Sequence, residues 1–163
     1  MKISVFGYPY SGSEKAAEKL SKLFGYEITS PEEAAMETIW EEDGPWLVHG
    51  IGEYEDFDKQ LHASDMCLML APSSFKCAVG ALKAHAGFGR AMQALFLDRK
   101  GPVGLIIRDV GQDYDSKFIT IRSKRQWDDF MKGAAKMAGK TPKKKPEPEP
   151  APEAEAEEED SQA

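Results

Sequence analysis

Residues 3–12 read Ile-Ser-Val-Phe-Gly-Tyr-Pro-Tyr-Ser-Gly, and this stretch decides the fold expected for the chain. A short apolar run ends at a loop of glycine, tyrosine and serine, and a helix-forming segment follows from Ser13. In an open α/β sheet, the turn between the first strand and the first helix binds ligands, because the helix N-terminus offers free N–H groups and partial positive charge. The stretch therefore predicts an α/β domain with a loop for a small anionic or sugar-bearing ligand.

Strand-like and helix-like segments alternate along the rest of the chain. Strands are expected at residues 2–6, 26–29, 66–70, 103–107 and 118–121, and helices at 13–24, 31–40, 54–63, 79–97 and 123–137. Residues 46–51 fit either a short strand or an apolar loop. Such alternation is typical of a doubly wound parallel sheet. Five strands favour the flavodoxin-like α/β fold with strand order 2-1-3-4-5.

The composition divides the chain into an α/β domain at residues 1–139 and a Lys/Pro/Glu-rich tail at residues 140–163. The tail holds four lysines and eight acidic residues and no Ile, Leu, Val or aromatic residue, so it is expected to be disordered. It carries −4 of the net charge of −7, which leaves −3 on the domain. The acidic tail is expected either to solubilise the protein or to bind a protein partner.

The mild acidity of the domain argues against nucleic acid as a partner. No apolar stretch approaches the roughly 20 residues that a membrane helix needs, so no membrane partner is expected. Two cysteines are too few for a disulfide framework, and a cytoplasmic location is the simplest expectation. The three histidines show no metal-ligand spacing, so neither a metal nor another cofactor is expected. Whether the chain forms a homo-oligomer stays open.

The candidate ligand-binding residues follow from the switch-point rule for open α/β sheets. The loops after the first and third expected strands should meet at the carboxyl edge of the sheet. The first loop offers tyrosines suited to stacking on a base and a hydroxyl suited to a sugar or phosphate, and the second offers two more hydroxyls. These loop residues are Gly7, Tyr8, Tyr10, Ser11 and Gly12, with Pro72, Ser73 and Ser74.

A further candidate lies in the helix expected at residues 79–97. Gly87-Phe88-Gly89-Arg90 places two glycines there, and each costs about 1 kcal/mol relative to alanine inside a helix. A close approach of the backbone to a ligand explains this composition. Gly87 would then line the ligand site, and Arg90 would face a phosphate.

The first loop also half matches a phosphate-binding P-loop of pattern G-x-x-x-x-G-K-[ST]. Gly7 and Gly12 fit, but Ser13 stands at the lysine position and Glu14 at the hydroxyl position. Lys15, two places after the lysine position, is expected to point elsewhere. A divergent P-loop nucleotide-binding or kinase-like protein therefore stays as one alternative, and a non-enzymatic interaction protein with an acidic tail as another.

A longer resemblance starts from the same loop. Gly-Tyr-Pro-Tyr-Ser-Gly at residues 7–12 resembles the opening of small bacterial and phage proteins of the nucleoside 2-deoxyribosyltransferase-like family. Further short matches follow in order at residues 25–32, 57–70, 80–87 and 100–106, where Lys-Gly-Pro-Val resembles the start of that family's fourth strand. The resemblance implies a flavodoxin-like fold and a nucleoside or nucleotide ligand.

The chain departs from that family at its nucleophile. The family carries a glutamate on the helix after the third strand, where this sequence offers His85 or Ala84, and residues 72–97 contain no Asp or Glu. The resemblance therefore implies altered or lost chemistry on the N-glycosidic bond, and whether the chain is an enzyme stays open. His85 is the candidate catalytic residue, as a general base, because imidazole titrates near neutral pH.

Overall fold

The computed structural model of the chain describes residues 1–114 and 117–139. Five parallel strands form one sheet in the order β2-β3-β1-β4-β5, which confirms the expected parallel α/β class. The strands are β1 (Lys2–Gly7), β2 (Ile28–Thr29), β3 (Trp46–His49), β4 (Met66–Leu70) and β5 (Phe118–Ile121).

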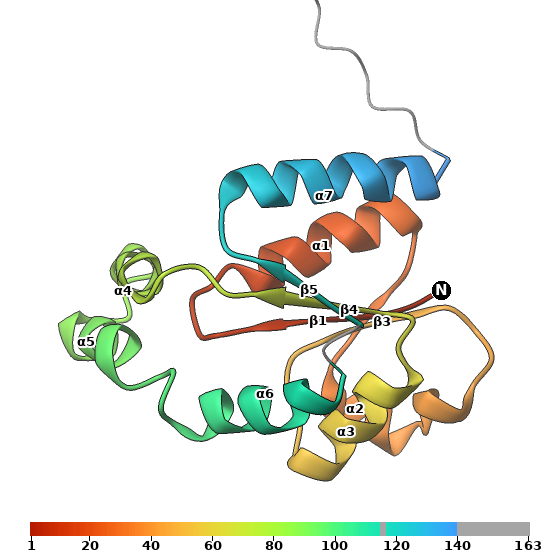
Figure 1. The fold of residues 1–163 in the computed structure, drawn as a ribbon, viewed down its shortest axis with the longest axis horizontal. Helices are drawn as coiled ribbons and strands as arrows, with labels where there is room; N and C mark the ends of the chain where they lie inside the picture. Colours follow the sequence, from red (N-terminus) through yellow and green to blue (C-terminus); the bar gives the residue numbers. More distant parts are fainter. Residues whose placement is uncertain (115–116, 140–163) are drawn as a thin grey trace, which may run out of the picture.

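Helices cover both faces of the sheet (Figure 1). On one face lie α1 (Ser13–Phe24) and α7 (Lys124–Met137). On the other lie α2 (Pro31–Met36), α3 (Tyr54–Ala63) and α6 (Pro102–Asp113), and the short helix η1 (Ile39–Glu41) links α2 to β3. Two further helices, α4 (Ser74–Lys83) and α5 (Phe88–Phe96), pack against each other beyond the carboxyl ends of the strands.

Side chains of β1 contribute to the two main hydrophobic cores, one on each face of the sheet. Ile3 and Val5 point toward α1 and α7 and pack with Leu20 and Leu68. Phe6 points the other way, and its ring meets Phe57 edge-on with centroids 5.1 Å apart. All of these side chains are fully buried, as expected for a central strand that is covered on both faces.

The expected strand order is corrected by β3. Residues 46–49 form a strand that pairs with β1 on one side and with β2 on the other, so β2 does not neighbour β1. Trp46, Leu47 and Val48 are all buried, because the strand is interior and covered on both faces. The order is therefore 2-3-1-4-5 and not the flavodoxin-like 2-1-3-4-5.

The strand expected at residues 103–107 is wrong, because these residues begin helix α6. Pro102 occupies the first turn, where its fixed φ and missing N–H favour a helix start. Val103, Ile106 and Ile107 then fall on one helical face and pack against the Phe6–Phe57 core. The β-branched residues of this segment thus form the buried face of a helix and not a strand.

The single helix expected at residues 79–97 is also corrected. The chain forms α4 and α5 with a break between them, where His85 has φ of 55° and Gly87 has φ of 87°. Glycine adopts positive φ without steric cost, which explains why one of the two glycines lies at this break.

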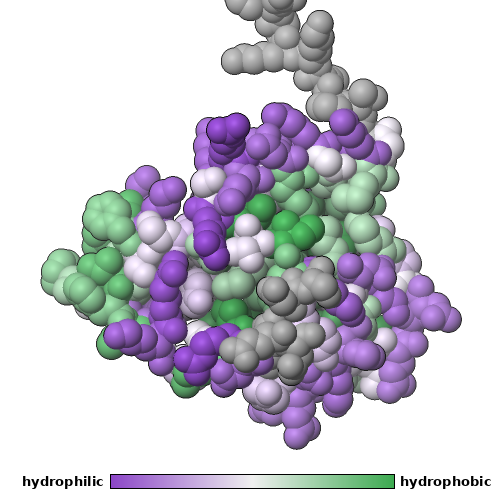
Figure 2. Space-filling model, in the orientation of Figure 1, coloured by the Kyte–Doolittle hydropathy of each residue, from purple (hydrophilic) through white to green (hydrophobic). Residues whose placement is uncertain are grey.

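Helices α4 and α5 also carry exposed apolar side chains, which form the green area at the left of Figure 2. Among them, Phe75, Phe88 and Phe96 are each more than half exposed. The homo-oligomer stays a prediction. No helix in the described part of the chain is long and apolar enough to cross a membrane. The predicted disorder of residues 140–163 lies outside the described residues.

Candidate functional site

The loop between β1 and α1 lies where neighbouring strands end. Gly7 pairs with Leu70 of β4, so the loops after β1 and β4 leave adjacent strands at the same edge of the sheet. A Cβ atom at Gly7 would lie 2.5 Å from the Leu70 carbonyl oxygen and 2.5 Å from Ser11 Oγ. Glycine is therefore required at this point, and the tight contact fixes where the loop starts.

The β1–α1 loop leads into a helix N-terminus that no side chain caps. Ser11 N donates to the Tyr8 carbonyl over 3.0 Å, and Gly12 adopts φ of 89° as the N-cap of α1. No side chain caps α1, and its first backbone bond is from Ala16 N to Gly12 O. The N–H groups of Ser13, Glu14 and Lys15, in the first turn of α1, thus have no acceptor within the helix. They form the positive end of the helix dipole.

A cleft on the α7 side of this loop, here called the basic cleft, has a volume of about 330 Å³. Five cationic residues and no acidic residue line it. Its lining residues are Ser11, Gly12, Lys15, Ala16, Lys19, Leu70, Pro72, Lys76, Ile121, Arg122, Ser123, Lys124 and Trp127.

Among the described residues, no carboxylate pairs with the cations of the basic cleft. Within residues 1–114 and 117–139, no ion pair involves Lys15, Lys19, Lys76, Arg122 or Lys124. Lys19 Nζ lies 5.6 Å from the centre of the Trp127 ring. Ser11 Oγ is buried and has no hydrogen-bond partner among the described residues. The cleft thus offers positive charge and a spare hydroxyl to an anion.

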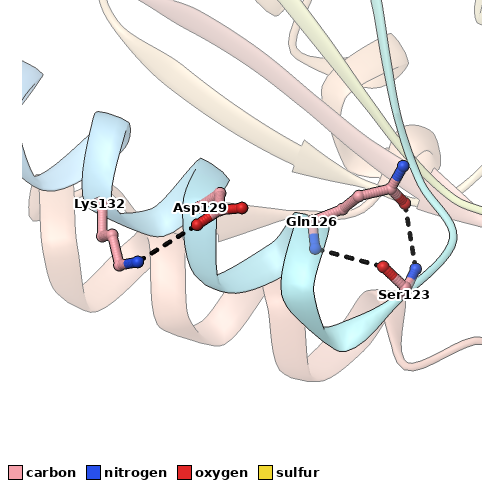
Figure 3. Close-up of polar contacts among 4 residues, drawn as sticks. All are labelled: Ser123, Gln126, Asp129 and Lys132. Carbon is pink, nitrogen blue, oxygen red and sulfur yellow. Dashed lines mark hydrogen bonds and ion pairs between the residues drawn. The ribbon is translucent and has the colours of Figure 1, made fainter.

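Helix α7 also begins at this cleft, but its N-terminus is capped by side chains. Ser123 Oγ accepts from Gln126 N over 3.3 Å, and Gln126 Oε1 accepts from the N–H of Ser123 over 3.2 Å (Figure 3). The same oxygen accepts from Arg122 N over 2.8 Å. Of the two helix ends at the cleft, α1 is therefore the one that lacks a side-chain cap.

A second cleft, here called the tyrosine cleft, lies on the other side of the β1–α1 loop and has a volume of about 660 Å³. It shares Gly12 and Lys15 with the basic cleft. Its lining residues are Gly7, Tyr8, Pro9, Tyr10, Gly12, Ser13, Glu14, Lys15, His49, Gly50, Ile51, Gly80, Lys83, Ala84 and Val103.

A serine and a histidine meet in the tyrosine cleft. Ser13 Oγ, on the first residue of α1, lies 3.1 Å from His49 Nε2 at the end of β3. Burial lowers the pKa of His49 and outweighs the opposite effect of the Glu14 carboxylate. The ring is therefore neutral at pH 7, as an acceptor of the Ser13 hydroxyl proton must be.

This lowered pKa has a consequence for stability. His49 takes up a proton at a higher pH in the unfolded chain than in the folded chain. The contribution of His49 to the free energy of unfolding is therefore constant above about pH 6.5 and decreases as the pH drops below that value. We expect acidification from about pH 7.5 to about pH 5.5 to destabilise the wild type by up to about 1 kcal/mol more than His49→Gln. Urea unfolding at both pH values measures this, with the exposed His85→Gln as matched control. Equal pH dependence of wild type and His49→Gln would contradict it.

Two arginines, one on α5 and one in the turn that follows it, contact the rings of the two loop tyrosines. The Arg90 guanidinium lies 5.3 Å from the Tyr10 ring centre, and that of Arg99 lies 4.9 Å from the Tyr8 ring centre. Arg90 also pairs with Asp98 over 2.9 Å, and this hydrogen bond raises the pKa of Arg90. Arg90 is thus engaged by protein groups and lines neither cleft.

The thiols are not activated nucleophiles. Burial raises the pKa of Cys67 to about 11, and burial also raises the pKa of Cys77. Both thiols are therefore protonated at neutral pH, and a protonated thiol is a poor nucleophile. Among the described residues no group of His, Cys, Asp and Glu is suited to holding a metal ion.

The structure gathers most of the residues predicted for the site. Gly7, Tyr8, Tyr10 and Gly12 line the tyrosine cleft, and Ser11, Gly12 and Pro72 line the basic cleft. The others do not line either cleft: Ser73 and Gly87 are the N-caps of α4 and α5, Ser74 begins α4, and His85 is exposed just after α4. Their roles in binding, and that of His85 in catalysis, stay predictions.

Sequence reasoning missed several lining residues. Lys15 was expected to point elsewhere and instead lines both clefts. His49 comes from the strand whose assignment was left open. Arg122 and Lys124 directly follow β5, and their position after a strand at the sheet edge was the signal that could have found them.

Comparison with known proteins shows no assigned family. No protein-family model matches the chain, and no curated protein matches it. Among solved structures, the chain is similar to "Shikimate kinase from Acinetobacter baumannii in complex with shikimate", with 13% identity and a TM-score of 0.42 over 85% of this chain and 88% of that chain.

The resemblance to nucleoside 2-deoxyribosyltransferase-like proteins is wrong. No family model and no curated protein of that family matches the chain. The fold disagrees as well, because β3 separates β1 from β2. The Lys-Gly-Pro-Val segment at residues 100–103, which was to lead into a fourth strand, leads into helix α6. Short matches at loop glycines and prolines reflect α/β turns in general and do not identify this family.

Proposed function

We propose that this chain binds a phosphate-bearing small molecule of the nucleotide type at the β1–α1 loop, as a divergent P-loop-like protein. One observation carries the proposal. The uncapped first turn of α1 lies with Lys15 at the junction of the two clefts. Four further cationic residues line the basic cleft, and no carboxylate is among its lining residues. Backbone N–H groups and unpaired cations around a concave site favour phosphate.

The phosphate would lie over the first turn of α1, with Lys15 supplying the charge that Ser13 does not. Ser13 and Glu14 stand at the positions of the lysine and the metal-binding hydroxyl of a P-loop. We therefore propose binding and not phosphoryl transfer, and we expect Mg²⁺ to contribute little to affinity.

The tyrosine cleft supports the nucleoside part of the proposal. Its volume of about 660 Å³ falls within the range of roughly 300–1,000 Å³ that is usual for small-molecule sites. Tyr8 and Tyr10 line it and offer aromatic surface to a base or sugar.

Calorimetric titration with adenosine, AMP and ADP, and with the corresponding thymidine series, tests this proposal. We expect each added phosphate to tighten binding by about tenfold or more, because each hydrogen bond to a charged group contributes about 1.5–3 kcal/mol. We also expect affinity for the diphosphate to weaken as NaCl rises from about 0.05 M to about 0.3 M, because salt screens exposed charges. Nucleosides that bind as tightly as their diphosphates in both series would overturn the proposal.

A further inference from the structure

The basic cleft concentrates positive charge on a protein that is acidic overall. The chain carries a net charge of −7, yet the lining of this cleft contains four lysines and one arginine and no Asp or Glu. Some cations elsewhere pair with carboxylates, as Lys132 does with Asp129 over 3.2 Å on α7 (Figure 3). The cleft cations are left for a negatively charged occupant.

The chain contains a segment of matching chemistry. Between residues 147 and 160 there are eight carboxylates and no basic residue. Prolines alternate with glutamates in its first half, as Pro146-Glu-Pro-Glu-Pro150. Proline-rich segments dock on grooves that present aromatic rings. The basic cleft provides the half-buried Trp127 ring beside apolar surface from Leu70 and Ile121.

The distances along the chain suit docking within one molecule. Helix α7 starts at the cleft with Lys124 and ends at Met137, so its 14 residues span about 21 Å. Glu147, the first residue of the acidic segment, follows Gly139 by eight residues, and a proline-rich chain of that length spans up to about 25 Å. A linker whose span matches the separation gives an effective concentration in the millimolar range.

We propose that the acidic C-terminal segment, residues 147–160, docks in the basic cleft of its own chain. Its carboxylates pair with Lys15, Lys19, Lys76, Arg122 and Lys124, and its prolines pack on Trp127. This goes beyond the proposed function and does not depend on it. If both hold, the segment and a phosphate-bearing ligand compete for Lys15.

Charge elsewhere on the domain directs the segment to this cleft. On the opposite face of the sheet, η1 and the start of α3 carry acidic residues, among them Glu41, Glu53 and Glu55, and they repel it. The longest run of consecutive basic residues, Lys143–Lys145, lies within the tail itself. Pairing with that run is the competing arrangement, and the experiment separates the two.

Zero-length carbodiimide cross-linking of the full-length protein, mapped by mass spectrometry, tests the docking. We expect carboxylates of residues 147–160 to cross-link to Lys15, Lys19, Lys76 and Lys124 within one chain, at a yield that does not change on dilution. Raising NaCl from about 0.05 M to about 0.5 M should lower this yield by about fivefold or more, because the Debye length shrinks. The exposed Lys59 and Lys100, which line neither cleft, serve as internal controls.

Charge reversal provides the second arm. In Lys19→Glu/Lys124→Glu the yield at Lys15 and Lys76 should fall by about fivefold or more, and in Lys59→Glu/Lys100→Glu it should stay at the wild-type level. Circular dichroism checks that both variants are folded, and the salt dependence of the wild type remains decisive if one is not. Cross-links confined to Lys143–Lys145, spread equally over control lysines, or formed only between chains would overturn the proposal.

Discussion

Replacing Gly7 by alanine should destabilise the protein by about 3 kcal/mol, because the added methyl group meets backbone that cannot move cheaply. Its Cβ would lie 2.5 Å from the Leu70 carbonyl oxygen, which belongs to a strand paired on both sides. Relief requires separating β1 from β4 or displacing the loop that follows. Denaturant unfolding of wild type and Gly7→Ala measures the difference.

Gly133 offers a matched control for that substitution. It lies within α7, and a Cβ atom there would meet nothing within 4 Å. Gly133→Ala should therefore stabilise the protein by about 0.5–1 kcal/mol through helix propensity. The same chemical change is thus expected to have opposite signs at the two positions. A Gly7→Ala variant as stable as the wild type would contradict the tight β1–β4 junction.

The largest expected effect on binding comes from Lys15→Glu. Lys15 lines both clefts and lies next to the open N–H groups of α1. Reversing its charge removes an attraction to phosphate and adds a repulsion, so we expect about a 30-fold loss of ADP affinity, or about 2 kcal/mol. Titration calorimetry measures the loss.

The control for this prediction is Lys59→Glu, which makes the same charge change on α3 outside both clefts. It should change ADP affinity by less than about twofold, because long-range effects of exposed charges are screened. Equal losses in the two variants would mean that net charge, and not the position of Lys15, governs binding.

Local signals in the sequence predicted much of the fold. Ser30 and Ser123 each form the reciprocal side-chain and backbone bonds of a capping box, which is a pattern of residues close together in the sequence. The apolar run of β4 and the spacing of Ala16, Ala17 and Leu20 in α1 are local patterns as well, and they form a buried strand and a buried helix face. These features depend on residues close together in the chain.

The errors arose where tertiary structure decides. Residues 46–49 are too few to distinguish a strand from a loop until β1 and β2 pair with them. Residues 103–107 include three β-branched side chains, yet Pro102 and the position of Val103 and Ile107 against the Phe6 core make the segment helical. The strand order followed from these two assignments, and so it could not be predicted from sequence alone.

The sequence predicted the loop at the candidate site but not the cationic residues that gather around it. Gly7 and Gly12 identify the β1–α1 turn through local pattern. The basic cleft instead combines Lys15 and Lys19 of α1 with Lys76 of α4 and the segment after β5. Those segments are far apart in the sequence, and no spacing rule brings them together.

The most direct test of the central claim is where a phosphate-bearing ligand binds. Amide NMR shifts of the full-length protein should be followed during titration with ADP, with adenosine as the matched ligand. We expect ADP to cause its largest changes at the N–H groups of Ser13, Glu14 and Lys15, because these groups would donate to the phosphate. Largest changes on α5, or equal changes at these residues with adenosine and with ADP, would contradict a phosphate site at the β1–α1 loop.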